Sequence, residues 1–221
     1  MTLSRTVAVP GMLAEYEAFG ELIDGLSAQQ WAKPTRCSGW TVADVAAHVV
    51  GQLTDVVQLR LEGLGSPEVT DREVAERKGR TPAELVDELR AGAKAGAEMA
   101  AAFDDAAWDG PIDGVDGTVG FGIEALWFDT YVHADDIRHA LGLPSVEGDG
   151  LIASASHLTQ ILTDRGWGPA DVRLGRLGTF PVSGGGGRTI DADPLEFALA
   201  ASGRLEPSRL GLDDSVNVYA P

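Results

Sequence analysis

Three ionisable residues share one face of a strongly apolar segment, residues 122–141. Asp129, His133 and Asp136 stand at i, i+4 and i+7, and a helix turning about 100° per residue gathers them within about 60° of arc. Burying such groups unpaired costs roughly 1–3 kcal/mol each. A carboxylate and an imidazole at i, i+4 can hold one metal ion. The spacing indicates either a metal site or a local Asp–His hydrogen bond.

His48 is a matching polar residue in a second apolar helical pattern, residues 41–61. It stands at the edge of the apolar stripe, so in a bundle of neighbouring helices it can face Asp129 and His133. Two imidazoles and one carboxylate leave a coordination position open, the composition of a catalytic zinc site. The alternative is that other polar groups satisfy His48 separately.

Helical periodicity and start signals predict the elements that must position these residues. Thr41 stands three residues before Asp44, a capping-box pattern, and Thr81-Pro82 repeats a helix-start signature. The polar residues 66–79 are expected to form a mobile connection, and the Gly- and Asp-rich residues 109–120 a loop. The predicted helices of the N-terminal part cover residues 10–26, 41–61, 81–103 and 122–141.

The pattern changes after Pro144, where Gly-separated short segments replace long helices. These segments predict two helices and two strands, followed by a short apolar end. The helices cover residues 151–163 and 194–201, the strands 172–174 and 179–182, and the apolar end 216–219. The chain is therefore predicted to be α+β, with a four-helix bundle over residues 1–144 and a small α+β domain over residues 145–221.

Composition excludes several classes of protein. The 221 residues include 17 Lys+Arg and 34 Asp+Glu, a net charge of −17 without a basic patch, so a nucleic-acid partner is not expected. No apolar run approaches 18 residues, which argues against a membrane span. The single cysteine, Cys37, and the lack of a signal-peptide pattern favour a cytoplasmic protein. The oligomeric state, monomer or homodimer, stays open.

Two segments of the chain resemble a known family. Residues 37–49 (CSGWTVADVAAHV) and 129–144 (DTYVHADDIRHALGLP) look like two signatures of the mycothiol-dependent maleylpyruvate isomerase family, a branch of the DinB-like superfamily. Residues 193–204 resemble the terminal helix and Gly-Arg pair of that family's second domain. The resemblance covers the whole chain and implies a DinB-like four-helix bundle followed by a small sterol-carrier-like α+β domain.

The resemblance also implies a chemistry. It implies a divalent metal, usually zinc, held by His48, Asp129 and His133, with mycothiol as co-substrate. A coordinating metal deprotonates a thiol that would otherwise be mostly protonated at neutral pH. The thiolate would attack a small electrophile, giving S-transfer if the adduct persists or cis–trans isomerisation if it collapses after bond rotation.

Position 129 departs from the family pattern, because the isomerases typically carry Glu there and other DinB-like proteins His. Aspartate is one methylene shorter, so Asp129 needs a closer backbone or a bridging water to reach a metal. We therefore expect the broader class, thiol transfer, rather than the named isomerisation. The alternative is a non-catalytic DinB-like binding or regulatory module with a degenerate metal site.

Two further residues are candidates for catalysis. Asp136 is predicted to accept the second ring proton of a ligating histidine, the alternative being a solvated acid or one paired with Arg138. Arg204 is a candidate to hold a carboxylate of the substrate or the thiol through a forked pair of hydrogen bonds, the alternative being a surface arginine.

Three neighbours of these motifs are expected to have no chemical role. Asp135 is predicted to lie at the surface, Cys37 to be a small packed residue of the loop, and Trp40 to anchor the start of its helix.

Overall fold

A computed structural model describes residues 3–112 and 115–219 of the chain. The chain divides into two compact units, Ser4–Val146 and Glu147–Pro221. The N-terminal unit is helical with one short hairpin, and the C-terminal unit combines helices with a small sheet. The α+β prediction is therefore confirmed.

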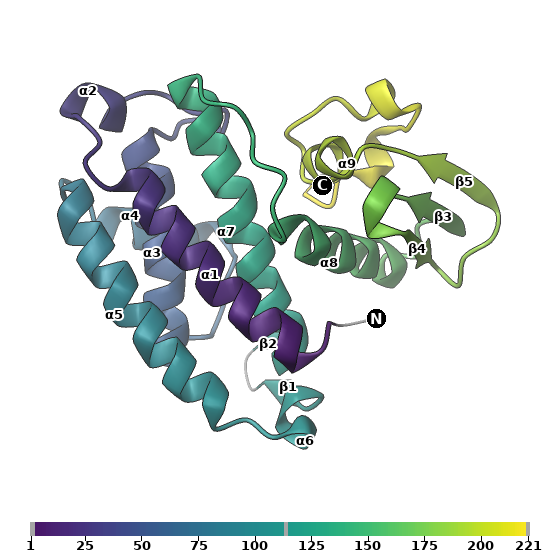
Figure 1. Ribbon diagram of the computed structural model, residues 1–221, viewed down its shortest axis with the longest axis horizontal. Helices are drawn as coiled ribbons and strands as arrows, with labels where there is room; N and C mark the ends of the chain where they lie inside the picture. Colours follow the sequence, from purple (N-terminus) through teal and green to yellow (C-terminus); the bar gives the residue numbers. More distant parts are fainter. Residues whose placement is uncertain (1–2, 113–114, 220–221) are drawn as a thin grey trace. The chain divides into compact units, whose positions relative to one another are not determined.

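The N-terminal unit is built around four long helices (Figure 1). Helix α1 packs against α5 and α7, and α3 packs against the same two helices. Their apolar faces form the core, which includes Tyr16, Phe19, Leu53, Leu89 and Phe128. The four helices are α1 (Arg5–Ile23), α3 (Val42–Val57), α5 (Pro82–Ala101) and α7 (Val119–Leu141).

Local signals start two of these helices where the sequence predicts. The Thr41 hydroxyl accepts from the backbone N–H of Asp44, and the Asp44 carboxylate accepts from the backbone N–H of Thr41 at 2.8 Å. Thr81 forms the same capping box at the start of α5, with Pro82 at the first helical position. Helices α1 and α7 begin a few residues earlier than predicted.

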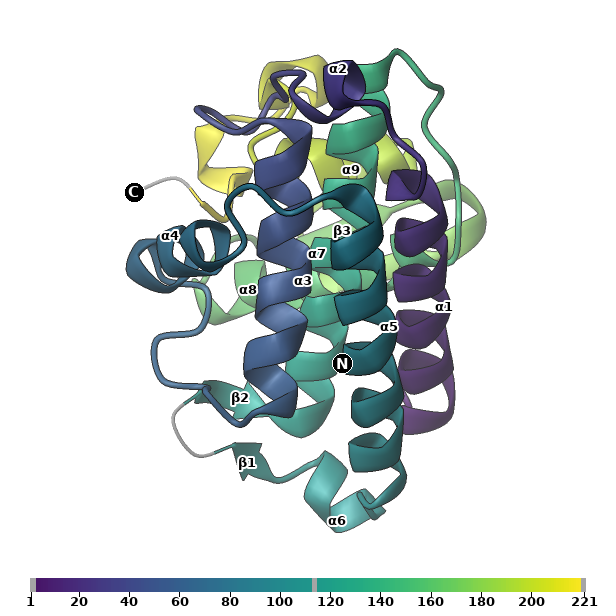
Figure 2. The same cartoon turned by 90° about the vertical axis from the view of Figure 1, so that its left-hand side faces the viewer.

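The prediction of a mobile connection over residues 66–79 is wrong, because a further helix, α4 (Pro67–Glu76), lies there. Ser66 caps it by accepting from the backbone N–H of Val69, and Pro67 occupies its first turn. Helix α4 lies against α3, outside the four-helix arrangement (Figure 2). Its residue Glu73 is 1% exposed, although the segment is polar overall.

Ion pairs and one glycine hold α4 against the bundle. Asp55 of α3 is fully buried and pairs with Arg72 of α4. Arg77 follows α4 and donates to Glu88 of α5 at 2.6 Å. A Cβ at Gly51 would lie 2.6 Å from the Cβ of Glu73, so only glycine lets the two helices approach this closely.

The remaining elements of this unit are short. Helices α2 (Ala28–Trp31) and α6 (Asp105–Trp108) are single turns. Strands β1 (Pro111–Ile112) and β2 (Val115–Thr118) form an antiparallel pair where a loop over residues 109–120 was predicted, although residues 113–114 of that loop lie outside the described ranges. Within those ranges, no helix is long and apolar enough to cross a membrane.

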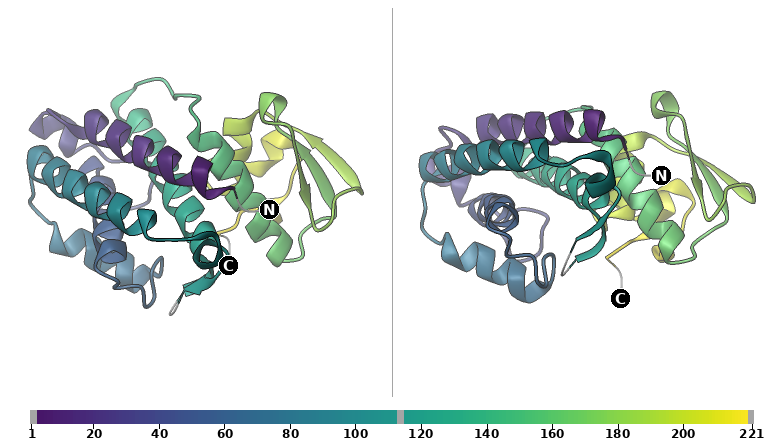
Figure 3. Two further views of the ribbon diagram at one scale, coloured as in Figure 1. Left: turned by 60° about the horizontal axis from the view of Figure 1, so that its bottom comes forward. Right: turned by 90° about the horizontal axis from the view of Figure 1, so that it is seen from below.

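The C-terminal unit contains a three-stranded sheet beside two helices (Figure 3). The central strand β3 pairs antiparallel with β4 and parallel with β5, and α8 packs against α9 and β4. Val172 of β3 is opposite Phe180 and Ile190 in the two registers. The elements are α8 (Gly150–Asp164), β3 (Ala170–Arg173), β4 (Thr179–Val182), β5 (Arg188–Asp191) and α9 (Pro194–Ala201).

Substitution Gly51→Ala tests the close approach of α3 and α4. The added methyl group collides with Glu73, an overpacking that costs roughly 1–3 kcal/mol and is partly offset by about 1 kcal/mol of better helix propensity. We expect urea denaturation to show a net loss of up to about 2 kcal/mol in the free energy of unfolding, which is about 1–3 kcal/mol below the value expected from the gain in helix propensity alone. The matched control is Gly20→Ala, whose Cβ would meet Leu89 at an ordinary 3.5 Å. Equal stability of the two variants would contradict the prediction.

Candidate metal centre

Helices α3 and α7 bring the three predicted ligands together in the interior of the bundle. The donor atoms of His48, Asp129 and His133 all lie within 4.8 Å of one another. The Nε2 atom of His48 is 3.3 Å from Asp129 Oδ2, and the Nε2 atom of His133 is 3.5 Å from Asp129 Oδ1. Both imidazoles therefore present the same nitrogen to one carboxylate.

A buried carboxylate holds the other nitrogen of each imidazole. The Nδ1 atom of His48 lies 2.7 Å from Glu73 Oε2, and the Nδ1 atom of His133 lies 2.9 Å from Asp136 Oδ2. A carboxylate at Nδ1 keeps a proton on that atom and leaves the Nε2 lone pair for a metal. Each histidine is thus oriented in the way that metal-ligating histidines are.

The spacing of the donors fits a small divalent cation. Ligand bonds of about 2.0–2.2 Å in tetrahedral geometry separate neighbouring donor atoms by about 3.4 Å. Each imidazole Nε2 lies close to this separation from one oxygen of the Asp129 carboxylate, His48 at 3.3 Å from Oδ2 and His133 at 3.5 Å from Oδ1. One donor atom from each of the three residues lies within 4.8 Å of the other two. The shorter side chain at position 129 reaches both histidines, since α3 and α7 pack directly against each other.

The site is shielded from solvent. His48 and His133 are 5% and 6% exposed, whereas the Asp129 side chain is 17% exposed. The Trp40 ring, predicted only as an anchor of the helix start, lies 5.3 Å from the ring of His48 and 6.2 Å from that of His133. Trp40 therefore also covers the two imidazoles.

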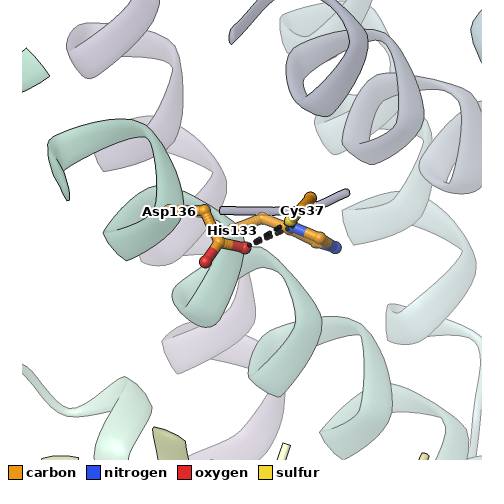
Figure 4. Close-up of side chains that lie close together, drawn as sticks. All are labelled: Cys37, His133 and Asp136. Atoms are coloured by element: carbon orange, nitrogen blue, oxygen red, sulfur yellow. Dashed lines mark hydrogen bonds and ion pairs between the residues drawn. The ribbon is translucent and has the colours of Figure 1, made fainter. Parts of the chain in front are cut away.

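Asp136 is the centre of a second cluster next to His133 (Figure 4). It is fully buried and accepts hydrogen bonds from the thiol of Cys37 at 3.1 Å and from Arg36 Nε. Asp136 pairs with the guanidinium of Arg36, whereas the sequence suggests Arg138 as an alternative partner. The Cys37 sulfur also lies 3.9 Å from His133 Nδ1, so Cys37 contacts the site as well as packing in the loop.

The prediction that Asp135 lies at the surface is wrong. Asp135 is 4% exposed, and Arg36 Nη2 donates to its carboxylate. One guanidinium thus compensates two adjacent buried acids. A buried carboxylate is stable only with such a partner.

Glu73 and Arg36 are the site residues that the sequence reasoning missed. Glu73 belongs to a segment whose polar composition suggested a connection. The signal that identifies its helix is Ser66-Pro67, the same Ser/Thr-Pro start that marks α5. Arg36 carries no local signal, because its partners lie about 100 residues further along the chain.

Arg204 belongs to the C-terminal unit. It is half-buried, and its Nη1 atom donates to the carbonyl of Ser202 at 3.2 Å. It lines a small cavity of about 360 Å³ together with Arg209 and Asn217.

The two carboxylates around His48 control its protonation. Burial lowers the pKa of His48, but hydrogen bonds and charge attraction from Asp129 and Glu73 outweigh this effect and raise the pKa to about 9. At neutral pH the metal-free site therefore holds a positive charge between two acids. Tyr16 lies near Asp129 and Thr130, and burial raises the pKa of its phenol well above the usual value, so it stays neutral.

Comparison with known proteins places the chain in a family. The family model of the mycothiol maleylpyruvate isomerase N-terminal domain matches residues 12–138, and the chain belongs to this family. No curated protein sequence matches the chain.

Two crystal structures of a mycothiol-dependent maleylpyruvate isomerase share the fold. One is a histidine-to-alanine variant that is 16% identical with a TM-score of 0.63. The other is 19% identical with a TM-score of 0.61. In each case the likeness covers 91% of this chain and 90% of that chain. At these identities the likeness establishes the fold.

The stability of the metal-free protein is expected to depend on pH through His48. Its pKa is about 9 in the folded protein and 6.5 in the unfolded chain. The stabilisation is complete below pH 6.5 and is lost as the pH rises through 9. Urea denaturation in the presence of a chelator should show a loss on the order of 3 kcal/mol across this window. The variant His48→Gln should lack the loss, and a flat wild-type profile would contradict the assignment.

Glu73→Gln tests the outer partner of His48. The neutral amide keeps the shape but lowers the basicity of the imidazole, so zinc affinity should fall about 10–100-fold in a competition titration with a chromophoric chelator. The matched control is Glu76→Gln on the same helix, where the side chain is 41% exposed and pairs with Arg72. Equal zinc affinity in the two variants would show that Glu73 does not support the site.

Proposed function

We propose that the protein is a metal-dependent enzyme that uses mycothiol for S-transfer to, or cis–trans isomerisation of, a small electrophilic substrate. The observation that carries the proposal is the convergence of two imidazole Nε2 atoms on the Asp129 carboxylate, with a buried carboxylate behind each ring. Family membership supports mycothiol as the thiol.

His48, Asp129 and His133 would hold the cation as three ligands, a number that leaves room for a fourth from the substrate. A divalent metal such as Zn²⁺ bound there would keep a coordinating thiol in its thiolate form at neutral pH.

The surrounding residues orient the ligands and exclude water. Glu73 and Asp136 fix the ring orientation and tautomer of the two histidines, and Arg36 balances the charge of Asp136. Trp40 covers the imidazoles and limits access of water. Asp136 touches His133 rather than the substrate, so its proposed role is that of a positioning residue.

Arg204 is proposed to bind an anionic carboxylate of the thiol or the substrate. Arg204 is a half-buried residue that lines a cavity of the C-terminal unit, and the planar fork of an arginine suits a carboxylate. The proposed partners are small molecules, the thiol and the electrophile.

Metal analysis of protein purified without chelator tests the proposal. We expect about one equivalent of divalent metal in the wild type and in His139→Ala, an exposed residue of the same helix. His133→Ala should lose both metal and mycothiol binding, measured by elemental analysis and calorimetry, because it removes a ligand. A wild-type content below a third of an equivalent, or unchanged metal in His133→Ala, would overturn the assignment. If excess Zn²⁺ does not raise the thermal stability of the metal-free protein, that result would favour a non-catalytic module.

A further inference from the structure

A second feature of the N-terminal unit is a partly open apolar cavity of about 510 Å³. Its lining comes from α1, α3, α5 and α7 and the connections near them. Every described residue of the lining is apolar or glycine, and none of these described residues carries a charge or a hydrogen-bonding side chain. The volume lies in the range of small-molecule sites.

The cavity and the metal centre lie along one stripe of α7. Gly122 and Leu126 line the cavity, and Asp129 and His133 follow them at alternating spacings of four, three and four residues. Residues with this spacing share one face of a helix. The stripe is therefore apolar in the first half of the helix and ionisable in the second.

Helices α3 and α1 show the same change from apolar residues at the cavity to polar residues near the metal centre. On α3, Val56 lines the cavity, His48 belongs to the metal centre, and Gln52 stands one turn from each. Gln52 is 9% exposed, and its Oε1 atom has no hydrogen-bond partner among the residues that the structure describes. On α1, Met12 lines the cavity and Tyr16, one turn later, lies near Asp129. A buried amide and a neutral phenol thus lie where the apolar space meets the ionisable residues.

Glycines leave room for the cavity. A Cβ at Gly96 of α5 would meet its nearest neighbours, Leu53 and Val57, only at 3.8 Å. A small side chain fits there without collision, and a longer one projects into the cavity that Gly96 lines. Gly96 is therefore a position where the space can be filled deliberately.

We propose that this cavity binds the apolar body of an uncharged electrophile, a conjugated ester or ketone, whose reactive carbon points toward the metal centre. The inference rests on the proposed function and names its substrate class. A dicarboxylate would have to place charges among apolar side chains, which is costly. In the addition that follows, the thiol S–H bond and the π bond of the conjugated C=C break, sulfur bonds to the β-carbon and the proton goes to the α-carbon, so no oxidant or reductant is required.

Two fluorescent probes that share one carbon framework test whether the cavity binds neutral molecules, and the measurement does not depend on catalytic activity. N-phenyl-1-naphthylamine is neutral, and 8-anilinonaphthalene-1-sulfonate is the same molecule with a sulfonate. We expect the neutral probe to bind in a one-to-one complex with enhanced fluorescence, and the anionic probe to bind at least tenfold more weakly. Equal affinity for the two probes would overturn the proposal.

Gly96→Leu locates the bound probe. Filling the cavity should weaken binding of the neutral probe at least tenfold, whereas Ala95→Leu, which adds the same side chain at the exposed neighbouring position, should leave it unchanged. If Gly96→Leu does not fold, Met99→Trp is the second filling variant, because Met99 is a half-buried residue that also lines the cavity. If a folded Gly96→Leu or Met99→Trp variant binds the neutral probe as tightly as the wild type, the probe does not bind in this cavity and the proposal is overturned.

Turnover with mycothiol separates failure of the inference from failure of the proposed function. We expect dibutyl maleate, a neutral diester, to have a higher kcat/KM than maleate, and Gly96→Leu to lose at least tenfold of the diester activity while retaining its metal. Preference for maleate would reject the substrate class even if metal and thiol bind. Absence of metal and turnover, with probe binding intact, would reject the catalytic function and leave an apolar binding site.

Discussion

The N-terminal unit is organised around two imidazoles whose Nδ1 atoms are each held by a buried carboxylate. Glu73 and Asp136 are almost completely excluded from solvent, and a carboxylate in such a place is stable only if it is paired. His48 pairs with Glu73, and His133 together with Arg36 pairs with Asp136. These contacts turn both Nε2 atoms toward Asp129. The orientation of the candidate ligands is therefore part of how the bundle satisfies its own buried charges.

This constraint explains why α4 is present. The helix is too polar to be stabilised mainly by apolar burial, yet it carries Glu73 to the Nδ1 atom of His48. The buried Asp55 attracts Arg72, and the absence of a side chain at Gly51 lets the two backbones approach. The charges that attach α4 to the bundle and the contact that orients His48 thus belong to one electrostatic network.

The sequence reveals the cluster of candidate ligands because His48, Asp129 and His133 interrupt apolar stripes at helical spacing, a signal contained within each helix. Capping boxes at Thr41 and Thr81 likewise define helix starts from adjacent residues. Glu73 and Arg36 give no comparable signal. Their roles depend on partners 25 and about 100 residues away, and polar composition alone does not distinguish a solvated connection from a helix that buries one acid.

The succession of residues along α7 connects the site to the kind of molecule it can accept. Gly122 and Leu126 border apolar space, and Asp129 begins the ionisable half of the same stripe. Charge interactions are stronger where water is excluded, so an apolar chamber next to the histidines would strengthen the attraction between the ligands and a cation. Under the proposed function, the same chamber would disfavour substrates that carry their own charge. Excluding water and favouring neutral substrates would then both follow from one arrangement of side chains in the N-terminal unit.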